Sequence, residues 1–580
     1  MKHAALPSPA DPAPDSSDRH GGIDRAFHAA IGNFTGGLSP MALATAWFDW
    51  AVHLAGSPAK QAMLHEEAVA GAARMAQNAV GCCLGTAPFA HARLQEDRRF
   101  NDPEWQHWPF DLTARCFQLT EAWWDSATRD VQGMNPRHAQ LTNFAARQLL
   151  DAVAPSNFAP TNPVVIKRTQ EEHGANLMRG LHNYLEDLAQ LAQGGTPDTG
   201  DYKVGETLAA TPGEVVHRTP LMELIRYTPV TETVQAEPLL IVPAWIMKYY
   251  ILDLSERNSM VRHLTEQGFE VYMISWLNPG EGEAQMGLED YLTQGIFAAM
   301  DTIERAVPGT KVHAAGYCLG GTLLSIAAAT LAREGRHDRL ASLTLLAAQV
   351  DFTEAGEITL FIDDSQVAFL EDIMAQQGYL RSDQMAGAFQ MLRSVDLIWS
   401  RTIREYLLGE RAAMIDLVAW NADTTRMPAK MHSEYLRQLF LRNRLALGTF
   451  EIGDDPVALA DIRLPVFAVG TERDHIAPWP SVWKIGRFVN GPVTFVLTSG
   501  GHNAGIVSEP GHPRRHYRIG PVPLHAADHE DWVAATPVQD GSWWLEWTRW
   551  LNAQAKGDAR AAQKDALPSL GAAPGSYVFG

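Results

Sequence analysis

A cysteine flanked by glycines constrains this chain more than any other feature of its sequence. The apolar run Val312 to Ala315 leads into Gly316-Tyr317-Cys318-Leu319-Gly320-Gly321, and helical composition resumes at Thr322. The spacing G-x-nucleophile-x-G is typical of a nucleophile elbow, a sharp strand-to-helix turn in which a Cβ at either glycine would clash with a neighbouring element. Such a turn presents Sγ of Cys318 at the N-terminus of a helix, which can stabilise a thiolate or an oxyanion. The alternative is a glycine-rich turn around a buried structural cysteine, so the interpretation requires partner residues.

Two later apolar runs each end close to a polar residue that could be such a partner. Leu464 to Gly470 precedes Asp474, and Val493 to Leu497 precedes His502, about 28 residues after that aspartate. The order nucleophile, acid, histidine is that of the α/β-hydrolases, in which adjacent strand ends bring the three groups together. We therefore predict an α/β-hydrolase fold with Cys318 as nucleophile, Asp474 as acid and His502 as base. The rival candidates are Asp351 as acid and His313 and His475 as bases.

The elbow GYCLGG resembles the lipase-like box of the polyhydroxyalkanoate synthases, in which cysteine replaces serine. Other segments resemble the same family: Lys248 to Leu254, Ser275 to Pro279, Trp420 to Thr425, Asp474 to Ile476, Pro155 to Phe158 and Thr161 to Pro163. The resemblance covers roughly residues 60 to 552, and it is to a divergent, class I-like poly-3-hydroxybutyrate synthase. The chain departs from the commoner pattern at two positions. Tyr317 stands where phenylalanine is more usual, and Asn503 stands where an apolar residue usually follows the histidine.

The resemblance implies polymerisation of (R)-3-hydroxyacyl-CoA into polyhydroxyalkanoate through a thioester on Cys318, with release of CoA. Because thiols and thioesters exchange acyl groups with little change in free energy, a cysteine at the elbow favours acyl transfer over ester hydrolysis. The backbone N–H of Leu319 is the expected oxyanion donor, with a second donor in the loop 244–247. The alternatives are a cysteine-elbow thioesterase, an intracellular polyester depolymerase with the same triad, and a non-catalytic granule or scaffold protein that keeps the fold.

Weaker predictions concern the substrate pocket and bound groups. Tyr249, Tyr250 and Asp253 follow the strand that normally supplies the oxyanion loop, and Trp420 lies in the expected cap, so all four are candidate pocket residues. A structural role is an equally good interpretation of each. No CxxC or HExxH motif suggests a metal, and we expect no cofactor beyond the CoA of substrate and product.

The organisation of the chain follows from changes in its pattern. We expect a disordered leader at 1–24, a helical N-terminal domain at 25–200 that ends in a hinge near 194–200, a catalytic domain at 201–552, and a tail at 553–580. Beyond the hinge, strand-like runs alternate with helical segments, which predicts a mostly parallel sheet covered by helices. A long helical interval at about 352–464 interrupts this alternation and is expected to form a cap above the site. The strand-like runs are Val215 to His217, Leu239 to Val242, Glu270 to Ile274, Val312 to Ala315, Leu343 to Leu346, Val466 to Val469 and Val493 to Leu497.

The charge and the cysteine content limit the possible partners of the protein and its cellular compartment. A net charge of −20 argues against nucleic acid as a partner. Four cysteines in 580 residues make no disulfide framework, no signal-like h-region opens the chain and no membrane-spanning run appears. These features favour the cytoplasm. The resemblance implies association with polyester granules and a self-sufficient homodimer.

Overall fold

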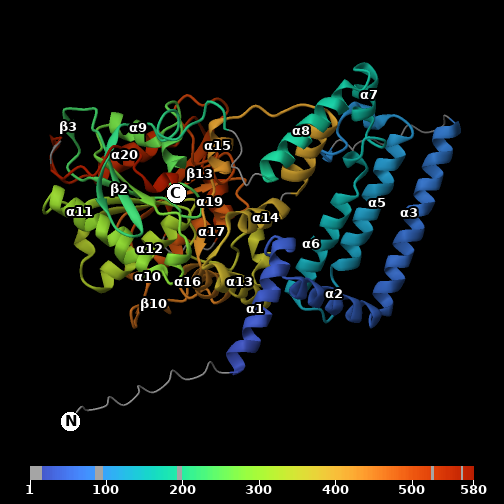
Figure 1. Ribbon diagram of the computed structural model, residues 1–580, viewed down its shortest axis with the longest axis horizontal. Helices are drawn as coiled ribbons and strands as arrows, with labels where there is room; N and C mark the ends of the chain where they lie inside the picture. Colours follow the sequence, from blue (N-terminus) through green and yellow to red (C-terminus); the bar gives the residue numbers. More distant parts are fainter. Residues whose placement is uncertain (1–15, 85–95, 193–198, 393, 524–527, 563–565) are drawn as a thin grey trace, which may run out of the picture.

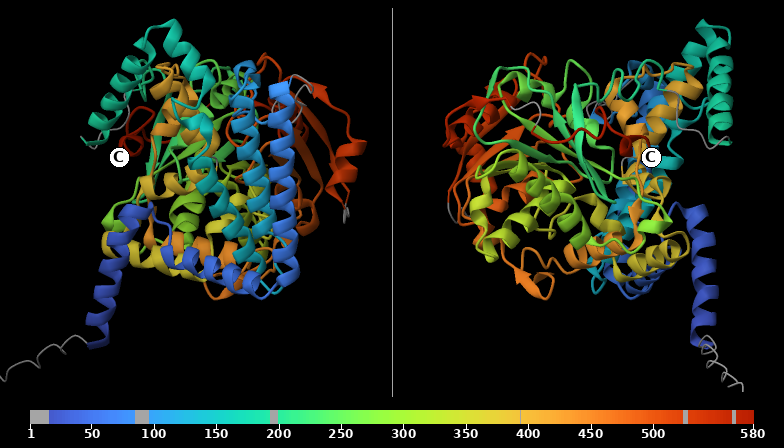
Figure 2. Two further views of the ribbon diagram at one scale, coloured as in Figure 1. Left: turned by 90° about the vertical axis from the view of Figure 1, so that its right-hand side faces the viewer. Right: turned by 60° about the vertical axis from the view of Figure 1, so that its left-hand side comes forward.

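The structure is a computed structural model that describes residues 16–84, 96–192, 199–392, 394–523, 528–562 and 566–580. The hinge predicted near 194–200 falls almost entirely outside these ranges. In Figure 1 a bundle of N-terminal helices stands beside the part that contains the sheet, and Figure 2 shows these helices lying over one side of it. No described helix is long and apolar enough to cross a membrane.

The N-terminal part is helical because its helices carry strong start signals. Ser39, Asn135 and Asn162 each accept a hydrogen bond from a backbone N–H in the first turn of the following helix, and each is followed by proline at the first helical position. This combination satisfies free N–H groups and presets the backbone for the helix. The helices are α1 (Ser16–Thr35), α2 (Pro40–Ala55), α3 (Pro58–Leu84), α5 (Phe110–Thr128), α6 (Pro136–Ala152), α7 (Pro163–Glu171) and α8 (Ala175–Ala192). The expected disordered leader differs from the structure at residues 16–24, which form the start of α1; residues 1–15 lie outside the described ranges.

A ten-stranded sheet forms the centre of the catalytic part, with the order β1-β2-β5-β4-β6-β7-β12-β13-β14-β15. The six strands from β5 to β13 in this order pair in parallel, and the outer pairs are antiparallel. Every residue of β4, β5, β6 and β12 is buried, as expected for parallel strands covered by helices. The predicted α/β-hydrolase fold is confirmed.

The bounds of the strands and of the helices that pack around them are as follows. The sheet contains β1 (Gly213–Arg218), β2 (Met222–Tyr227), β4 (Leu239–Val242), β5 (Val271–Trp276), β6 (Val312–Tyr317), β7 (Leu340–Leu346), β12 (Val466–Thr471), β13 (Val493–Thr498), β14 (His516–Val522) and β15 (Gln539–Asp540). The helices are α9 (Met260–Glu266), α10 (Leu288–Asp290), α11 (Ala298–Ala306), α12 (Leu319–Arg333), α17 (Trp479–Trp483), α18 (Ile485–Phe488), α19 (His529–Ala535) and α20 (Trp544–Gln554).

The interval between β7 and β12 is mostly helical, as its sequence predicts. It contains η7 (Glu357–Phe361), α13 (Asp364–Gln377), β8 (Tyr379–Leu380), α14 (Ser382–Leu392), η8 (Val395–Trp399), η9 (Thr402–Leu407), α15 (Asp416–Ala422), β9 (Met427–Pro428), α16 (Ala429–Glu434) and η10 (Tyr435–Leu441), followed by the hairpin β10 (Phe450–Ile452) and β11 (Asp455–Val457). We call residues 352–464 the cap.

The connection between α1 and α2 is fastened to the cap. The side-chain oxygen of Gln366 in α13 accepts a hydrogen bond from the backbone N–H of Ser39 at 2.7 Å, and its amide donates to the carbonyl of Gly37 at 2.7 Å. His28 of α1 pairs with Asp372 of α13 at 2.6 Å. The cap and residues 28–39 are therefore held together at the side of the molecule where the N-terminal helices meet the catalytic part.

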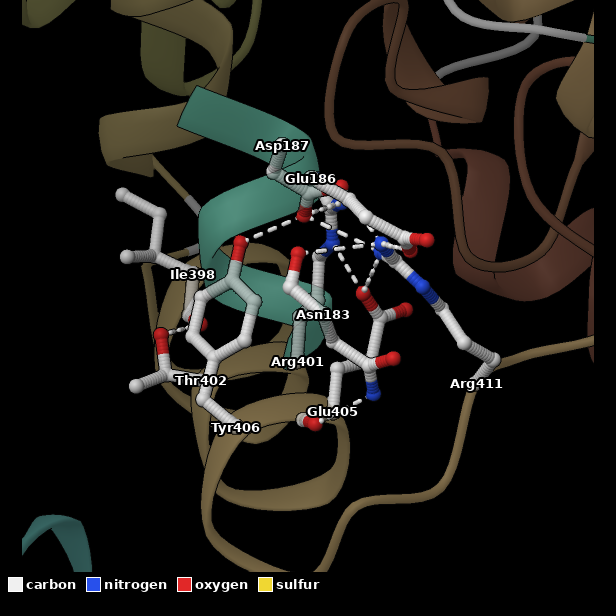
Figure 3. A network of polar contacts seen from close by, with 9 residues as sticks. All are labelled: Asn183, Glu186, Asp187, Ile398, Arg401, Thr402, Glu405, Tyr406 and Arg411. Carbon is white, nitrogen blue, oxygen red and sulfur yellow. Dashed lines mark hydrogen bonds and ion pairs between the residues drawn. The ribbon is translucent and has the colours of Figure 1, made fainter. Parts of the chain in front are cut away.

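A second attachment joins α8 to η9 through polar side chains (Figure 3). Asp187 accepts hydrogen bonds from Tyr406 at 2.7 Å and from Arg401 and Arg411 at 3.1 and 3.0 Å. The two elements approach so closely that a Cβ at Gly180 would lie 1.8 Å from the carbonyl oxygen of Tyr406. Glycine is therefore required at this crossing, and the network fixes α8 against the cap.

The described part of the predicted tail packs along the outer strands. Leu570 donates its backbone N–H to the carbonyl of Val215 at 2.8 Å, and the N–H groups of Ser576 and Tyr577 donate to Glu223 at 2.8 and 2.9 Å. The last residues of the chain thus cover the β1 and β2 side of the sheet.

Candidate active site

The elbow at the end of β6 has the geometry that its glycines predict. Cys318 lies between β6 and α12 with φ 52° and ψ −124°, a conformation that costs free energy in a residue other than glycine. A Cβ at Gly316 would lie 2.4 Å from Cα of Gly321, and one at Gly320 would lie 2.3 Å from the carbonyl oxygen of Val242. The N–H of Cys318 donates to the carbonyl of Leu346 in β7 at 2.8 Å. Close packing on both sides therefore holds the cysteine in its strained turn.

Asp474 and His502 meet at the neighbouring strand ends. β12 and β13 pair in parallel, so the loops that follow them leave the sheet at the same edge. Nδ1 of His502 lies 2.7 Å from Oδ2 of Asp474, and Oδ1 of Asp474 accepts the backbone N–H groups of Ile476 and Ala477 at 2.9 Å each. The sulfur of Cys318 also acts on this ring, because it raises the pKa of His502. Since Nδ1 faces the aspartate, Nε2 is the imidazole nitrogen left for the sulfur.

The electrostatics of this buried group favour a charged histidine. Burial alone lowers the pKa of His502, but the carboxylate of Asp474 and the sulfur of Cys318 raise that pKa well above its usual value. Burial alone raises the pKa of Asp474, but His502 and the two backbone N–H groups hold it below its usual value. The site can therefore stabilise an imidazolium beside a thiolate, which is the state that a nucleophilic cysteine requires.

The rival candidates have other partners. Asp351 accepts a hydrogen bond from Asn443 at 2.8 Å and lies 3.2 Å from Nζ of Lys484. His313 lies within β6, its Nδ1 is 2.7 Å from Oγ of Ser342, and burial lowers its pKa to about 4. His475 is half-buried in the loop after β12, where its carbonyl accepts the N–H of Glu357. The structure brings none of these three to the sulfur.

A cavity of about 120 Å³ lies directly beside Cys318. Its walls come from the elbow at Leu319 and Thr322, from Ile246 in the loop after β4, and from cap residues that include Tyr435 and Phe440. Leu319 opens α12, so its backbone N–H has no acceptor within the helix and is available to an oxyanion. The expected oxyanion loop 244–247 thus borders the same cavity as the elbow.

The four candidate pocket residues lie outside the cavity beside Cys318. Trp420 is buried and donates its indole N–H to the carbonyl of Lys248 at 2.8 Å, while Tyr250 donates to Asp423 at 2.7 Å. Asp253 accepts a hydrogen bond from Ser259 at 2.6 Å, and Tyr249 is buried beside it in η3 (Tyr249–Asp253). None of the four lines the cavity beside Cys318. Tyr250 and Trp420 thus join the segment after β4 to the cap, whereas Asp253 is bound within the catalytic part.

Sequence reasoning missed the polar side chains that do line this cavity: Gln349, Gln366, Gln384, His432 and Tyr435. All lie in or next to the cap, at positions with no shared spacing or motif. No sequence signal distinguishes them from other cap residues.

The two departures from the commoner family pattern contact each other. Oη of Tyr317 donates a hydrogen bond to Oδ1 of Asn503 at 2.6 Å, and the Tyr317 ring lies 5.6 Å from the ring of His502. These residues directly precede the elbow cysteine and directly follow the histidine. Their hydrogen bond ties the elbow to the histidine loop.

We expect Tyr317→Phe to slow acylation of the enzyme about 3- to 10-fold, because a neutral hydrogen bond contributes about 0.5–1.5 kcal/mol. The change leaves the ring beside His502 and removes the donor to Asn503. Burst kinetics of CoA release would measure the effect. A Tyr317→Phe/Asn503→Leu double variant is the control and should recover part of the rate, since no polar group is then left without its partner. Additive losses in the double variant would contradict this account.

Across the described residues, no group of three or more histidine, cysteine, aspartate or glutamate side chains could hold a metal ion.

The sheet and the elbow define a protein of the α/β-hydrolase fold with cysteine at the nucleophile position. A sequence model described as alpha/beta hydrolase fold matches residues 237–509, and models described as the poly-beta-hydroxybutyrate polymerase N-terminus match residues 96–264 and 19–60. The chain belongs to the poly(3-hydroxyalkanoate) polymerase family and is an acyltransferase.

The relatives resemble this chain over most of their length. A poly(3-hydroxyalkanoate) polymerase from Methylorubrum extorquens is 44% identical over 490 residues, which are 83% of this chain and 80% of that one. A polymerase subunit from Rhizobium meliloti is 40% identical, covering 85% and 81%. The corresponding subunit from Cupriavidus necator is 35% identical, covering 83% of each.

Proposed function

We propose that this enzyme polymerises (R)-3-hydroxyacyl-CoA into polyhydroxyalkanoate through a thioester on Cys318, with release of CoA and with no further cofactor. The observation that carries the proposal is the hydrogen bond between His502 and Asp474 at the same sheet edge as Cys318, in a chain of this family. The mainly apolar cavity beside Cys318 also supports acyl transfer over hydrolysis. In a site with little water, an alcohol is favoured over water as the group that takes the acyl group from the cysteine.

In the first half-reaction His502 takes the proton from Cys318, and the thiolate attacks the thioester carbonyl carbon. The tetrahedral oxyanion accepts a hydrogen bond from the backbone N–H of Leu319 and a second one from a donor in loop 244–247. The bond from carbon to the CoA sulfur then breaks, and His502 returns its proton to the departing CoA. Cys318 is left as an acyl thioester.

In the second half-reaction a 3-hydroxyl group and the acyl group meet at Cys318. His502 takes the hydroxyl proton as the oxygen attacks the acyl carbon, the bond to Sγ breaks, and the proton passes to the sulfur. Each cycle forms one ester bond and regenerates the thiol. Asp474 orients His502 and stabilises its positive charge.

Association with polyester granules in the cytoplasm is part of the proposal. The polar face of α8 faces the cap, so its apolar positions Met178, Leu181, Leu185 and Leu188 remain exposed. This arrangement is the reverse of that in an ordinary surface helix, which buries its apolar side. The exposed apolar side of α8 is suited to a polyester surface. A homodimer is proposed from the family resemblance alone.

Product analysis tests the proposal. Purified enzyme with 3-hydroxybutyryl-CoA is expected to yield insoluble polymer and one CoA for each unit incorporated. Free hydroxy acid with CoA would instead indicate a thioesterase, and release of hydroxy acid from added polyester would indicate a depolymerase. The same assay with 3-hydroxyacyl-CoA substrates of increasing chain length would define the side chains that the site accepts.

A further inference from the structure

A second cavity of about 580 Å³ adjoins the one beside Cys318. It lies between α2 and α6 of the N-terminal part and segments η7 and η8 of the cap. Leu38, Phe361 and Gln366 line both cavities. These three residues therefore belong to the common wall of the two cavities, and we call them the junction.

The junction is held in place by the attachment between the N-terminal part and the cap. Gln366 is fixed by its hydrogen bonds to Ser39 and Gly37, and Leu38 lies between those two residues in the chain. Phe361 comes from the other side, at the end of η7, where it also packs against Phe144 of α6 at 5.3 Å between ring centroids. The N-terminal helices thus extend the catalytic cavity outward.

The chemistry of the second cavity excludes CoA as its occupant. Its walls are mainly aliphatic and aromatic, and none of the described residues that line it is lysine, arginine or histidine. The one charged lining residue is Asp363, which is acidic. The anionic phosphate groups of CoA would find no positive partner there and would lose their hydration.

Two residues that line the second cavity have hydroxyl groups available to a ligand. Thr35 and Ser394 line this cavity, and their hydroxyl oxygens are buried and have no hydrogen-bond partner among the described residues. In the cavity beside Cys318 the amide nitrogen of Gln384 is likewise without a partner, whereas its oxygen accepts from Arg381 and Gln377. Buried donors without acceptors are unfavourable in the empty protein and would be satisfied by a ligand carbonyl.

Two acceptors without a partner lie nearer the sulfur. Oε1 of Gln349 and Nδ1 of His432 border the cavity beside Cys318 and have no partner in the described part of the chain. Burial lowers the pKa of His432 to about 4, so its ring is neutral and can accept a hydrogen bond. A 3-hydroxyl group of a reacting unit is a donor, and it is required at this end of the path.

We infer that the growing polyester passes the junction and occupies the second cavity, so that the N-terminal helices α2 and α6 form a binding site for the product chain. An aliphatic polyester matches this site, since each unit has an alkyl group and a carbonyl acceptor but no donor except at the chain end. Rotation of the Leu38 and Phe361 side chains opens the way between the two spaces. The inference rests on the proposed function and assigns a product-binding role to the N-terminal half.

Filling the second cavity tests the inference. Ala145 lies in α6 on its wall, half-buried and far in sequence from the elbow, and Ala145→Trp would occupy the space of the chain. Ala70→Trp, on an exposed position of α3 outside both cavities, is the matched control. The readouts are the first-turnover burst of CoA from 3-hydroxybutyryl-CoA and the molar mass of the polymer, with thermal unfolding as a check on folding.

We expect Ala145→Trp to keep the wild-type CoA burst and to give polymer several-fold shorter, while Ala70→Trp matches the wild type in both. Wild-type polymer length from folded Ala145→Trp would overturn the inference, and so would an equal shortening by Ala70→Trp. If the tryptophan variant does not fold, the CoA burst and the polymer length of Ala145→Leu are measured and judged in the same way. Failure of the wild-type enzyme to form polymer at all would instead refute the proposed function.

Discussion

Cys318→Ala is expected to abolish CoA release from 3-hydroxybutyryl-CoA, with a loss of roughly 10⁴-fold or more because the nucleophile is removed outright. Alanine has no side-chain atom that can attack the carbonyl, and His502 then has no proton to accept from the elbow. The measurement is CoA release over time, together with detection of acyl-enzyme by mass spectrometry. Neither signal should exceed the background of the uncatalysed reaction.

Cys116→Ala is the matched control for this experiment. Cys116 is an exposed free cysteine in α5, outside the cavity beside Cys318, and burial raises the pKa of its thiol. Its removal should leave CoA release unchanged. CoA release close to wild type from Cys318→Ala would remove Cys318 from its role.

Cys318→Ser separates chemistry from geometry at the same position. Serine fits the elbow, but an acyl-serine ester is a poorer acyl donor than a thioester. We expect slow acylation and little chain growth in this variant. This result would show that the sulfur is needed both to attack the thioester carbonyl and to pass the acyl group to the next hydroxyl.

Asp474→Asn is expected to slow polymer growth roughly 10³- to 10⁴-fold while leaving some acyl-enzyme. The reason is that His502 loses the carboxylate that orients its ring and stabilises its positive charge. In the wild type Asp474 and Cys318 outweigh burial and raise the pKa of His502; without the carboxylate, burial pulls that pKa down. His502→Gln removes the base itself and should abolish acylation in the same assay. Rapid polymer formation by the Asp474 variant would reject this aspartate as the acid.

The pH dependence of stability gives an independent measurement on the same variant. A histidine with a raised pKa in the folded state stabilises the protein below its unfolded pKa, near 6.5, and this contribution is lost as pH rises through the folded value. We expect Asp474→Asn to lose that stabilisation on the acid side of 6.5. Thermal unfolding from pH 5 to 9 and NMR titration of the His502 ring would report it. Asp351→Asn is the control, since Asp351 pairs with Asn443 and Lys484 and should leave the titration of His502 in place.

The parts of the site predicted from sequence are those set by local backbone geometry and chain order. The glycines around Cys318 predict the turn because a Cβ at Gly316 or Gly320 would lie within 2.4 Å of another backbone. The runs before Asp474 and His502 predict adjacent strand ends because buried parallel strands have a strong apolar signature. In contrast, β2, β14 and β15 were not predicted. They pair antiparallel at the outer parts of the sheet, and the sequence of β14, HYRIGPV, contains glycine and proline.

Conspicuous motifs were a poor guide to the pocket. The segment around Tyr249, Tyr250 and Asp253 is easily recognised, yet its side chains brace the loop after β4 and do not line the cavity. The lining instead includes Gly37, Gln384 and His432, which belong to no recognisable motif. A residue's neighbours in the chain carry little information about which distant element will pack against it.

The sequence by itself determined the strained cysteine turn, the order of the three reactive groups and the alternation of strands and helices, since each depends on short-range sterics or on burial patterns within a few residues. Only the tertiary structure decided that residues 36–38, more than 270 positions before Cys318, line its cavity, and that Leu38 also lines a second one. The reason is that a cavity is bounded by whichever elements the packing of the whole chain brings together, here through hydrogen bonds such as those of Gln366.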